Sequence, residues 1–243
     1  MIGNVSRGAV TQLLAGVLAQ SVTNPRAAEG GADGESLTRV RRRAPQMIRH
    51  RRQAISFGDY EALALEASPA VAVARALPTT HPTGRFAPGY VTVRIVPQST
   101  DVRPMPSFEL REQVRRFIAA RAPAAISHRI AVIPPVYLPV TVEAVVSPAN
   151  LSVAGDVLAR VLQAMATFLH PLTGGPWGRV WPFGRDVYLS DVAALLESLD
   201  GVDYIETLAL LVDGKHMRER VDVPTDRLVV AGPQRITLSG RVR

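Results

Sequence analysis

The sequence predicts an α+β protein in which two small two-layer α/β sandwich modules, of the ferredoxin-like kind, follow one another. Apolar residues make up 47% of the chain but aromatic residues only 5%, so aliphatic side chains must fill the core. Helical and strand periodicities alternate along most of the chain, and a short capped helix that leads into a strand occurs twice, from Ser56 and from Ser190. We expect an upstream linker or domain end at 1–35, a first module at 36–136, a second module at 137–212 and a β-rich extension at 213–243.

The first module should have the element order α-β-β-α-β. Its opening helix begins near Ser36, and Pro45 should kink or divide that helix because proline cannot donate the helical hydrogen bond. In the next helix, Tyr60, Leu63 and Ala64 recur at helical spacing and should face the core. The remaining elements are expected as strands at 71–77 and 90–96, a helix at 107–121 and a strand at 129–133.

The second module should have the order β-α-β-α-β, beginning with a strand from Leu138. A long amphipathic helix is expected at 154–169, and its core-facing residues should be Val157, Leu158, Val161, Leu162, Met165 and Phe168. After it come a Gly/Pro-rich loop at 170–186, a strand at 187–189, a helix at 191–199 and a strand at 202–212. The last thirty residues read as short strands separated by turns.

Four residues at the starts of the two short helices are candidate caps. They are Ser56, Asp59, Ser190 and Asp191. A hydroxyl or carboxylate at such a position accepts hydrogen bonds from exposed backbone N–H groups and complements the helix dipole. We interpret these residues as structural, and a catalytic role of the two carboxylates is the alternative.

Basic residues are concentrated in one segment. The net charge of the chain is +7, and residues 36–53 hold seven arginines and no acid, namely Arg39, Arg41, Arg42, Arg43, Arg49, Arg51 and Arg52. This segment is a candidate interface for an acidic protein partner, and the alternatives are a solvated helix face and a nucleic-acid surface. It lacks interleaved aromatic residues and a known DNA-binding motif, so we do not expect nucleic acid as the partner.

The motifs of common enzymes are missing from the sequence. There is no cysteine, the five histidines lack zinc-ligand spacing, and no Gly-x-Ser-x-Gly, Walker or Gly-x-Gly-x-x-Gly pattern occurs. No apolar run approaches the roughly 18–20 residues of a membrane span. We therefore expect no catalysis, no cofactor, no bound metal and no membrane span, with a hydrolase of unrecognised site as the weakest alternative.

The loop at 170–186 combines three aromatic residues with four glycines and three prolines. Glycine permits left-handed turns and proline restricts the chain, so the loop should be rigid. We interpret it as a docking element or a self-packed plug, and a ligand-binding loop is the alternative. Its interface candidates are Trp177, Arg179, Trp181 and Phe183.

Several stretches in this order resemble one known family. They read FLHPLTGGPWGR at 168–179, WPFGRDVY at 181–188 and VDYI at 202–205, with GGADGES at 30–36 and the helix at Ser56 upstream. Together they resemble the C-terminal part of the baseplate J-like family, the wedge proteins of contractile phage tails and phage-tail-like injection systems. The resemblance covers roughly residues 20–212.

The resemblance implies a non-enzymatic subunit of a baseplate wedge, assembled in the bacterial cytoplasm. Its implied partners are other copies of the chain, a second wedge protein, the hub and spike, and sheath-proximal baseplate proteins. Members usually carry a substantial region before the Gly-Gly-Ala-Asp segment, so we expect a short variant, a truncated gene model or a fragment of a longer subunit. The alternative function is a nucleic-acid-binding protein that uses the arginine-rich helix 37–52.

Overall fold

The computed structural model describes residues 6–12, 21–25, 37–176, 178 and 180–240. It has a mixed arrangement of helices and small sheets, which confirms the α+β prediction. The chain divides into two compact units, Met1–Arg51 and Arg52–Arg243.

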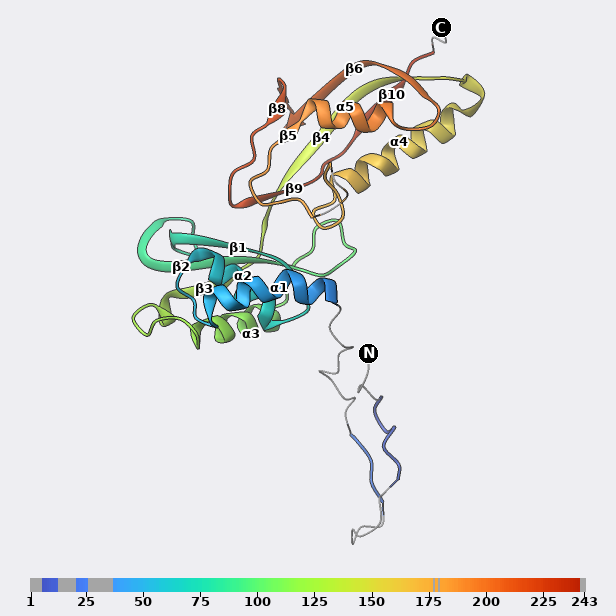
Figure 1. Ribbon diagram of the computed structural model, residues 1–243. Helices are drawn as coiled ribbons and strands as arrows, with labels where there is room; N and C mark the ends of the chain where they lie inside the picture. Colours follow the sequence, from blue (N-terminus) through green and yellow to red (C-terminus); the bar gives the residue numbers. More distant parts are fainter. Residues whose placement is uncertain (1–5, 13–20, 26–36, 177, 179, 241–243) are drawn as a thin grey trace. The chain divides into compact units, whose positions relative to one another are not determined.

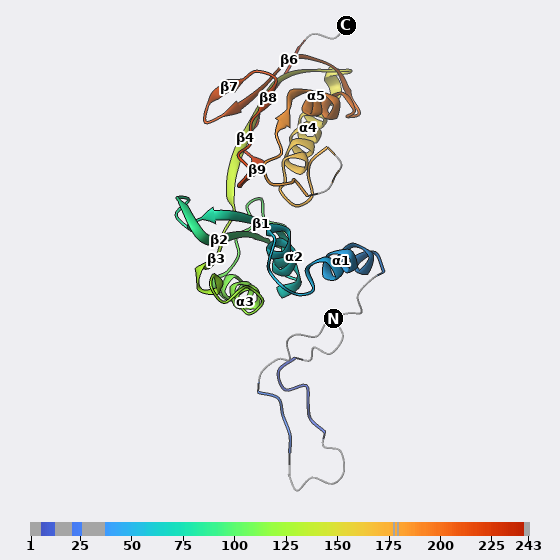
Figure 2. The same ribbon diagram turned by 60° about the vertical axis from the view of Figure 1, so that its left-hand side comes forward.

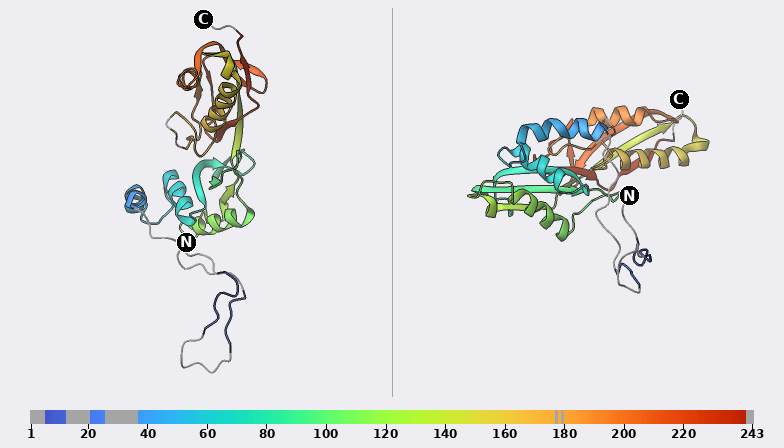
Figure 3. Two further views of the ribbon diagram at one scale, coloured as in Figure 1. Left: turned by 90° about the vertical axis from the view of Figure 1, so that its right-hand side faces the viewer. Right: turned by 60° about the horizontal axis from the view of Figure 1, so that its bottom comes forward.

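The first unit contains one helix, α1 (Leu37–His50), in its described part. Pro45 lies inside α1, so the helix is not divided at the proline. A kink there, the other form of the prediction, stays a prediction, since proline removes an N–H donor and its ring crowds the preceding turn. Upstream, residues 6–12 and 21–25 run side by side, joined by the Gly8 N–H and the Asn24 carbonyl oxygen at 3.0 Å (Figures 1 and 3). The expected cap at Ser36 lies outside the described residues.

The first module of the second unit has the element order α-β-β-α-β. The helix α1, which the prediction placed at the start of this module, belongs to the first unit. The elements of the module are α2 (Phe57–Ala67), β1 (Val71–Thr80), β2 (Phe86–Pro97), α3 (Phe108–Ala119), the single turn η1 (Ser127–Arg129) and β3 (Ile130–Ile133). The sheet order is β1-β2-β3, antiparallel between β1 and β2 and parallel between β2 and β3. Both strands of the β1-β2 hairpin are longer than predicted, because pairing continues to Thr80 opposite Phe86.

A hydrophobic core lies between this sheet and its two helices. On β2 the core residues are Val91, Val93 and Ile95, which alternate toward the helices. Tyr60, Leu63 and Ala64 of α2 are buried against them, as their spacing predicted. Figure 2 shows α2 and α3 covering one side of the sheet.

The N-terminus of α2 is capped by a carboxylate. Ser56 occupies the N-cap position, and Asp59 Oδ2 accepts hydrogen bonds from the backbone N–H groups of Ser56 at 2.6 Å and Ile55 at 3.2 Å. The corresponding prediction for Ser190 is wrong. α5 (Leu189–Glu197) starts earlier, with Tyr188 at the N-cap position, because the Leu189 N–H is already bonded to the Glu219 carbonyl oxygen.

The second module is built around the long strand β4 (Val136–Pro148). After it come the single turn η2 (Leu151–Val153), α4 (Ala154–Phe168), β5 (Val187–Tyr188), α5 and β6 (Val202–Val212). α4 and β6 match their predicted bounds within one residue. The chain then adds β7 (Lys215–Met217), β8 (Arg220–Val221), β9 (Arg227–Ala231) and β10 (Arg235–Leu238).

Residues 213–243, expected as an extension, contribute strands to this module. β9 and β10 pair in parallel with successive halves of β4, whose other edge is antiparallel to β6. The Gln234 side chain bridges the break between β9 and β10, accepting from the Val142 N–H at 2.8 Å and donating to the Val140 carbonyl oxygen at 3.1 Å. β8 pairs with β5. The strands β8, β9 and β10 therefore contribute to the hydrophobic core of the second module as well as to its sheets.

The helices α4 and α5 pack on one face of this sheet (Figures 1 and 2). Val157, Val161, Met165 and Phe168 of α4 are buried in the core, whereas Leu162, expected to face inward, is 38% exposed. By length and composition alone, Leu151–Phe168 could span a membrane, with a mean hydropathy of 1.2. The buried residues of α4 account for part of that apolar content, since 22% of this stretch is buried inside the structure.

Among the described residues, the side chains of Arg94, Tyr137 and His170 each make a polar contact that joins the two modules. The Arg94 guanidinium donates to Asp226 Oδ2 at 3.0 Å and to the Pro134 carbonyl oxygen at 2.9 Å. The Tyr137 hydroxyl donates to the Pro104 carbonyl oxygen at 2.6 Å, and burial raises the pKa of that hydroxyl. The third contact is made by His170 and is described below.

Two tyrosines give a matched test of this packing. Among the described residues the buried Tyr60 hydroxyl has no hydrogen-bond partner, whereas the Tyr137 hydroxyl has one. We predict that Tyr60→Phe leaves the free energy of unfolding unchanged or slightly higher, while Tyr137→Phe lowers it by about 1 kcal/mol. Urea unfolding followed by circular dichroism measures both values. Equal losses in the two variants would contradict the assigned contacts.

Candidate functional site

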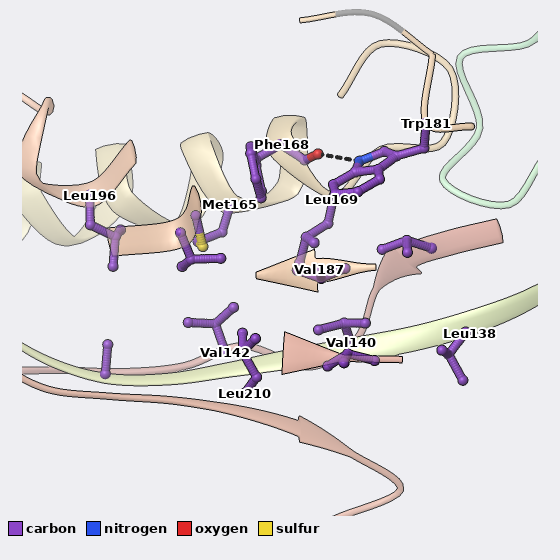
Figure 4. Close-up of a cluster of buried hydrophobic side chains, with 14 of the residues drawn as sticks. Leu138, Val140, Val142, Met165, Phe168, Leu169, Trp181, Val187, Leu196 and Leu210 are labelled. Atoms are coloured by element: carbon purple, nitrogen blue, oxygen red, sulfur yellow. Dashed lines mark hydrogen bonds between the residues drawn. The ribbon is translucent and has the colours of Figure 1, made fainter. Parts of the chain in front are cut away.

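The loop at 170–186 begins at the C-terminal end of α4, where backbone carbonyl groups lack helical donors. The Phe168 carbonyl oxygen accepts two hydrogen bonds from the loop. One comes from the Gly175 N–H at 2.7 Å and the other from the Trp181 indole Nε1–H at 2.8 Å (Figure 4). The loop therefore supplies the hydrogen-bond donors for the last carbonyl group of the helix that it follows.

Trp181 is a core residue. Its side chain is 0% exposed, and its ring meets the Phe168 ring edge-on, with the centroids 5.7 Å apart. Figure 4 shows the indole beside Leu169, above Val187 and β4. A side chain in this position is not available to a partner, which corrects the interpretation of Trp181 as a docking anchor. Its packing is that of a plug, and Phe183 is partly buried against the same core.

Gly174 passes so close to the end of α4 that no larger residue fits. A Cβ atom there would meet the backbone oxygens of Phe168, His170 and Thr167, with the latter two at 2.6 Å. These distances are far below van der Waals contact, and the obstacle is backbone, which has little room to move. The glycine is therefore required by close approach at this position.

His170 organises the start of the loop and links it to the first module. Its Nδ1 atom lies 3.2 Å from the backbone N of both Leu172 and Thr173, and 3.0 Å from Thr173 Oγ1. The Nε2 atom lies 3.1 Å from the Asp101 carbonyl oxygen, in the segment before α3. Since backbone groups engage both ring nitrogens, the histidine is placed as a structural connector.

The second half of the loop is tied to the C-terminal strands. The Gly184 N–H donates to the Arg227 carbonyl oxygen at 3.1 Å, and Asp186 Oδ1 accepts from the Val223 N–H at 2.9 Å. Arg185 lies 3.7 Å from Asp191, the carboxylate in the first turn of α5. These bonds fix the loop at both ends, which leaves its polar groups little freedom to act on a ligand.

The remaining predicted interface residues divide into those whose side chains the structure describes and those whose side chains it does not. Arg41, Arg49 and Arg51 are exposed, and Arg52 is exposed and lies 3.6 Å from Glu66. The side chains of Arg39, Arg42 and Arg43 lie outside the described part of the chain, as do Trp177 and Arg179. The exposed group is a cationic surface on α1 and the turn that follows it.

The sequence reasoning missed Arg94 as a site residue. It is nearly buried in β2 and lines a hollow of about 320 Å³ together with Thr92, His81 and Asp226. Because Asp226 neutralises its charge and Pro134 accepts a further bond, Arg94 holds the modules together. The sequence signal for this residue was a charged side chain between Val93 and Ile95.

In the described part of the chain, no group of three His, Asp or Glu side chains could hold a metal ion.

The structure is similar to that of a solved baseplate protein. No protein-family model matches the sequence, and no curated protein sequence matches it significantly. Among 18 similar chains from solved structures is one from the cryo-EM structure of the anti-feeding prophage baseplate, with a TM-score of 0.61 and 19% identity. The match covers 93% of this chain and 48% of that chain, so this chain spans about half its length. The two share a fold.

Removal of the Trp181 ring should be severe. We predict that Trp181→Ala lowers the free energy of unfolding by about 3–5 kcal/mol, because it opens a cavity and removes the indole donor to Phe168. Trp181→Phe, which keeps most of the volume, should cost about half as much or less. Chemical denaturation of the two variants provides the comparison, and a cost below about 1 kcal/mol for Trp181→Ala would show that the loop is not packed.

Two glycines of the loop form a matched pair for a steric test. Gly174→Ala should prevent stable folding, because backbone oxygens occupy the space of the new Cβ atom. Gly178→Ala meets no atom within 4 Å and should cost only about 1–2 kcal/mol for its positive φ of 60°. Thermal unfolding separates the two outcomes. Similar melting temperatures for both variants would rule out the close approach at Gly174.

Proposed function

We propose that the chain is a structural subunit of the baseplate of a contractile phage-tail-like particle. In this proposal it belongs to the baseplate wedge and links the central hub and spike to the outer baseplate and sheath. It acts through protein–protein contacts and without catalysis. The observation that carries the proposal is the fold shared with a chain of the anti-feeding prophage baseplate across 93% of this chain.

Two further observations support a structural role. The loop that sets this sequence apart has its central indole buried and its backbone bonded to α4 and to the C-terminal strands. The buried charge Arg94 is neutralised at a junction between modules. Both arrangements stabilise a fixed relation between folded parts, which a structural connector in a particle requires.

The partners proposed are further copies of this chain, a second wedge protein, and proteins of the hub and sheath-proximal baseplate. Exposed arginines of the segment at 36–53 are candidate contacts with acidic surfaces of such proteins. The particle would assemble in the bacterial cytoplasm.

Loss of the gene tests the proposal in the native host. We predict that a deletion strain produces tail-like particles without complete baseplates, and that the wild-type chain supplied in trans restores them. Electron microscopy of purified particles gives the fraction with baseplates, and an affinity tag locates the chain. The matched control is supply of the Gly178→Ala variant, which should restore assembly. Normal particles from the deletion strain would contradict the proposal.

A nucleic-acid-binding protein is the second candidate, and the seven arginines at 36–53 are the observation that favours it. Phosphate contacts by arginine make such binding fall steeply with salt. Tight binding of a DNA duplex at physiological salt, by a chain that never enters a particle, would favour this candidate over the baseplate role.

A further inference from the structure

We propose that α1 of one copy docks on the acidic end of the second module of another copy. This inference rests on the proposed function, because it names the surface by which copies of the chain would contact each other. The acidic end is defined here by Asp156, Glu197, Asp200, Asp203 and Glu206. The docking surface is the exposed face of α1, and its occupant is a second copy.

The exposed face of α1 combines apolar and cationic side chains. Leu37 and Ile48 are 75% and 77% exposed, and they are eleven residues apart, which places them on one side of a helix with 3.6 residues per turn. Arg41 is exposed one turn after Leu37, on the same side. Two exposed aliphatic side chains do not mark an interface by themselves. Here they add apolar area to a face that also carries positive charge.

The charge of this surface is unbalanced. The segment at 36–53 holds seven arginines and no acid, and no ion pair joins Arg41, Arg49 or Arg51 to a carboxylate within the part that the structure describes. A partner with carboxylates at similar density would reduce the repulsion among these guanidinium groups. The chemistry of the partner surface is therefore acidic with an apolar component.

The chain itself carries such a surface at one end of the second module. Residues 197–206 contain Glu197, Asp200, Asp203 and Glu206 and no basic residue, and all four side chains are exposed. Among the described residues these carboxylates form no ion pair. Arg160 donates to the backbone oxygen of Asp200, and Glu206 Oε1 accepts from the Tyr204 hydroxyl at 3.4 Å.

Apolar side chains lie beside these carboxylates. Leu151 and Val153, just before α4, are 47% and 41% exposed. The Ala149 N–H donates to the Gly201 carbonyl oxygen at 2.9 Å, which places this stretch next to the turn that carries Asp200. Asp156, exposed in the first turn of α4, adds a fifth carboxylate. The acidic end thus matches α1 in both charge and apolar content.

A second copy is the occupant that this complementarity favours. In a contact between α1 of one copy and the acidic end of the next, each copy uses two different surfaces. Such a heterologous contact repeats from copy to copy and closes into a ring or extends as a chain. Individual exposed ion pairs contribute little, so the contact depends on several charges together with the apolar side chains.

Charge reversal in the full chain tests the contact. One variant carries Arg41→Glu and Arg49→Glu, and the other carries Asp203→Arg and Glu206→Arg. Sedimentation velocity should show self-association of the wild type and a dissociation constant raised at least about tenfold in each variant alone. An equimolar mixture should associate again, because each reversed surface then meets one of opposite charge. The control Arg103→Glu/Arg218→Glu, with the same change in net charge, should leave association unchanged.

The outcomes separate this inference from the proposed function. A monomeric wild type, unchanged association in either reversed variant, or a mixture that fails to associate would each overturn the contact. If Arg41→Glu/Arg49→Glu associates normally but loses binding to a short DNA duplex, α1 is a nucleic-acid surface and the inference also fails. Incorporation of the wild-type chain into baseplates is scored separately, so the proposed function can stand when the contact between copies does not.

Discussion

The carbonyl oxygen of Phe168 is the point on which the second module depends. Phe168 is the last residue of α4, so no helical N–H group donates to this oxygen. It accepts hydrogen bonds from the Gly175 N–H and the Trp181 indole N–H instead. To deliver both donors, the chain must turn back tightly over the helix end, which only glycine at position 174 allows. The returning chain then seats Trp181 in the core and leads into β5.

From this point the rest of the fold is arranged by contacts distant in sequence. His170 reaches back to Asp101 before α3, and Asp186 and Gly184 reach forward to the strands after residue 219. These polar groups thus connect parts of the fold, and Arg94 with Asp226 is a further example. This distribution of polar contacts agrees with the structural role in a baseplate that we propose.

Sequence patterns predicted the elements that are determined by interactions between residues close together in the chain. The bounds of α4 followed from periodicity, because the helix buries one regular face on the core. Those of β6 were also correct, although its buried residues Leu210 and Leu211 are adjacent and do not alternate. The partners of β9 and β10 did not follow, since parallel pairing with β4 joins residues more than ninety positions apart. The start of α5 depended on a bond from Leu189 to Glu219, and the burial of Trp181 depended on the shape of a loop. Neither has a signature within a short window of sequence.

The central claim is that Trp181 and the turn at Gly174 and Gly175 are packed against the end of α4 and connect folded parts. Amide hydrogen exchange of the full chain tests it most directly. The account predicts that the Gly175 amide, the Trp181 amide and the Trp181 indole exchange as slowly as the buried turns of α4. The Gly175 amide and the indole donate to the Phe168 carbonyl oxygen, and the Trp181 amide donates to the Pro171 carbonyl oxygen. Exchange as fast as that of the exposed turn at Gly214 would contradict it.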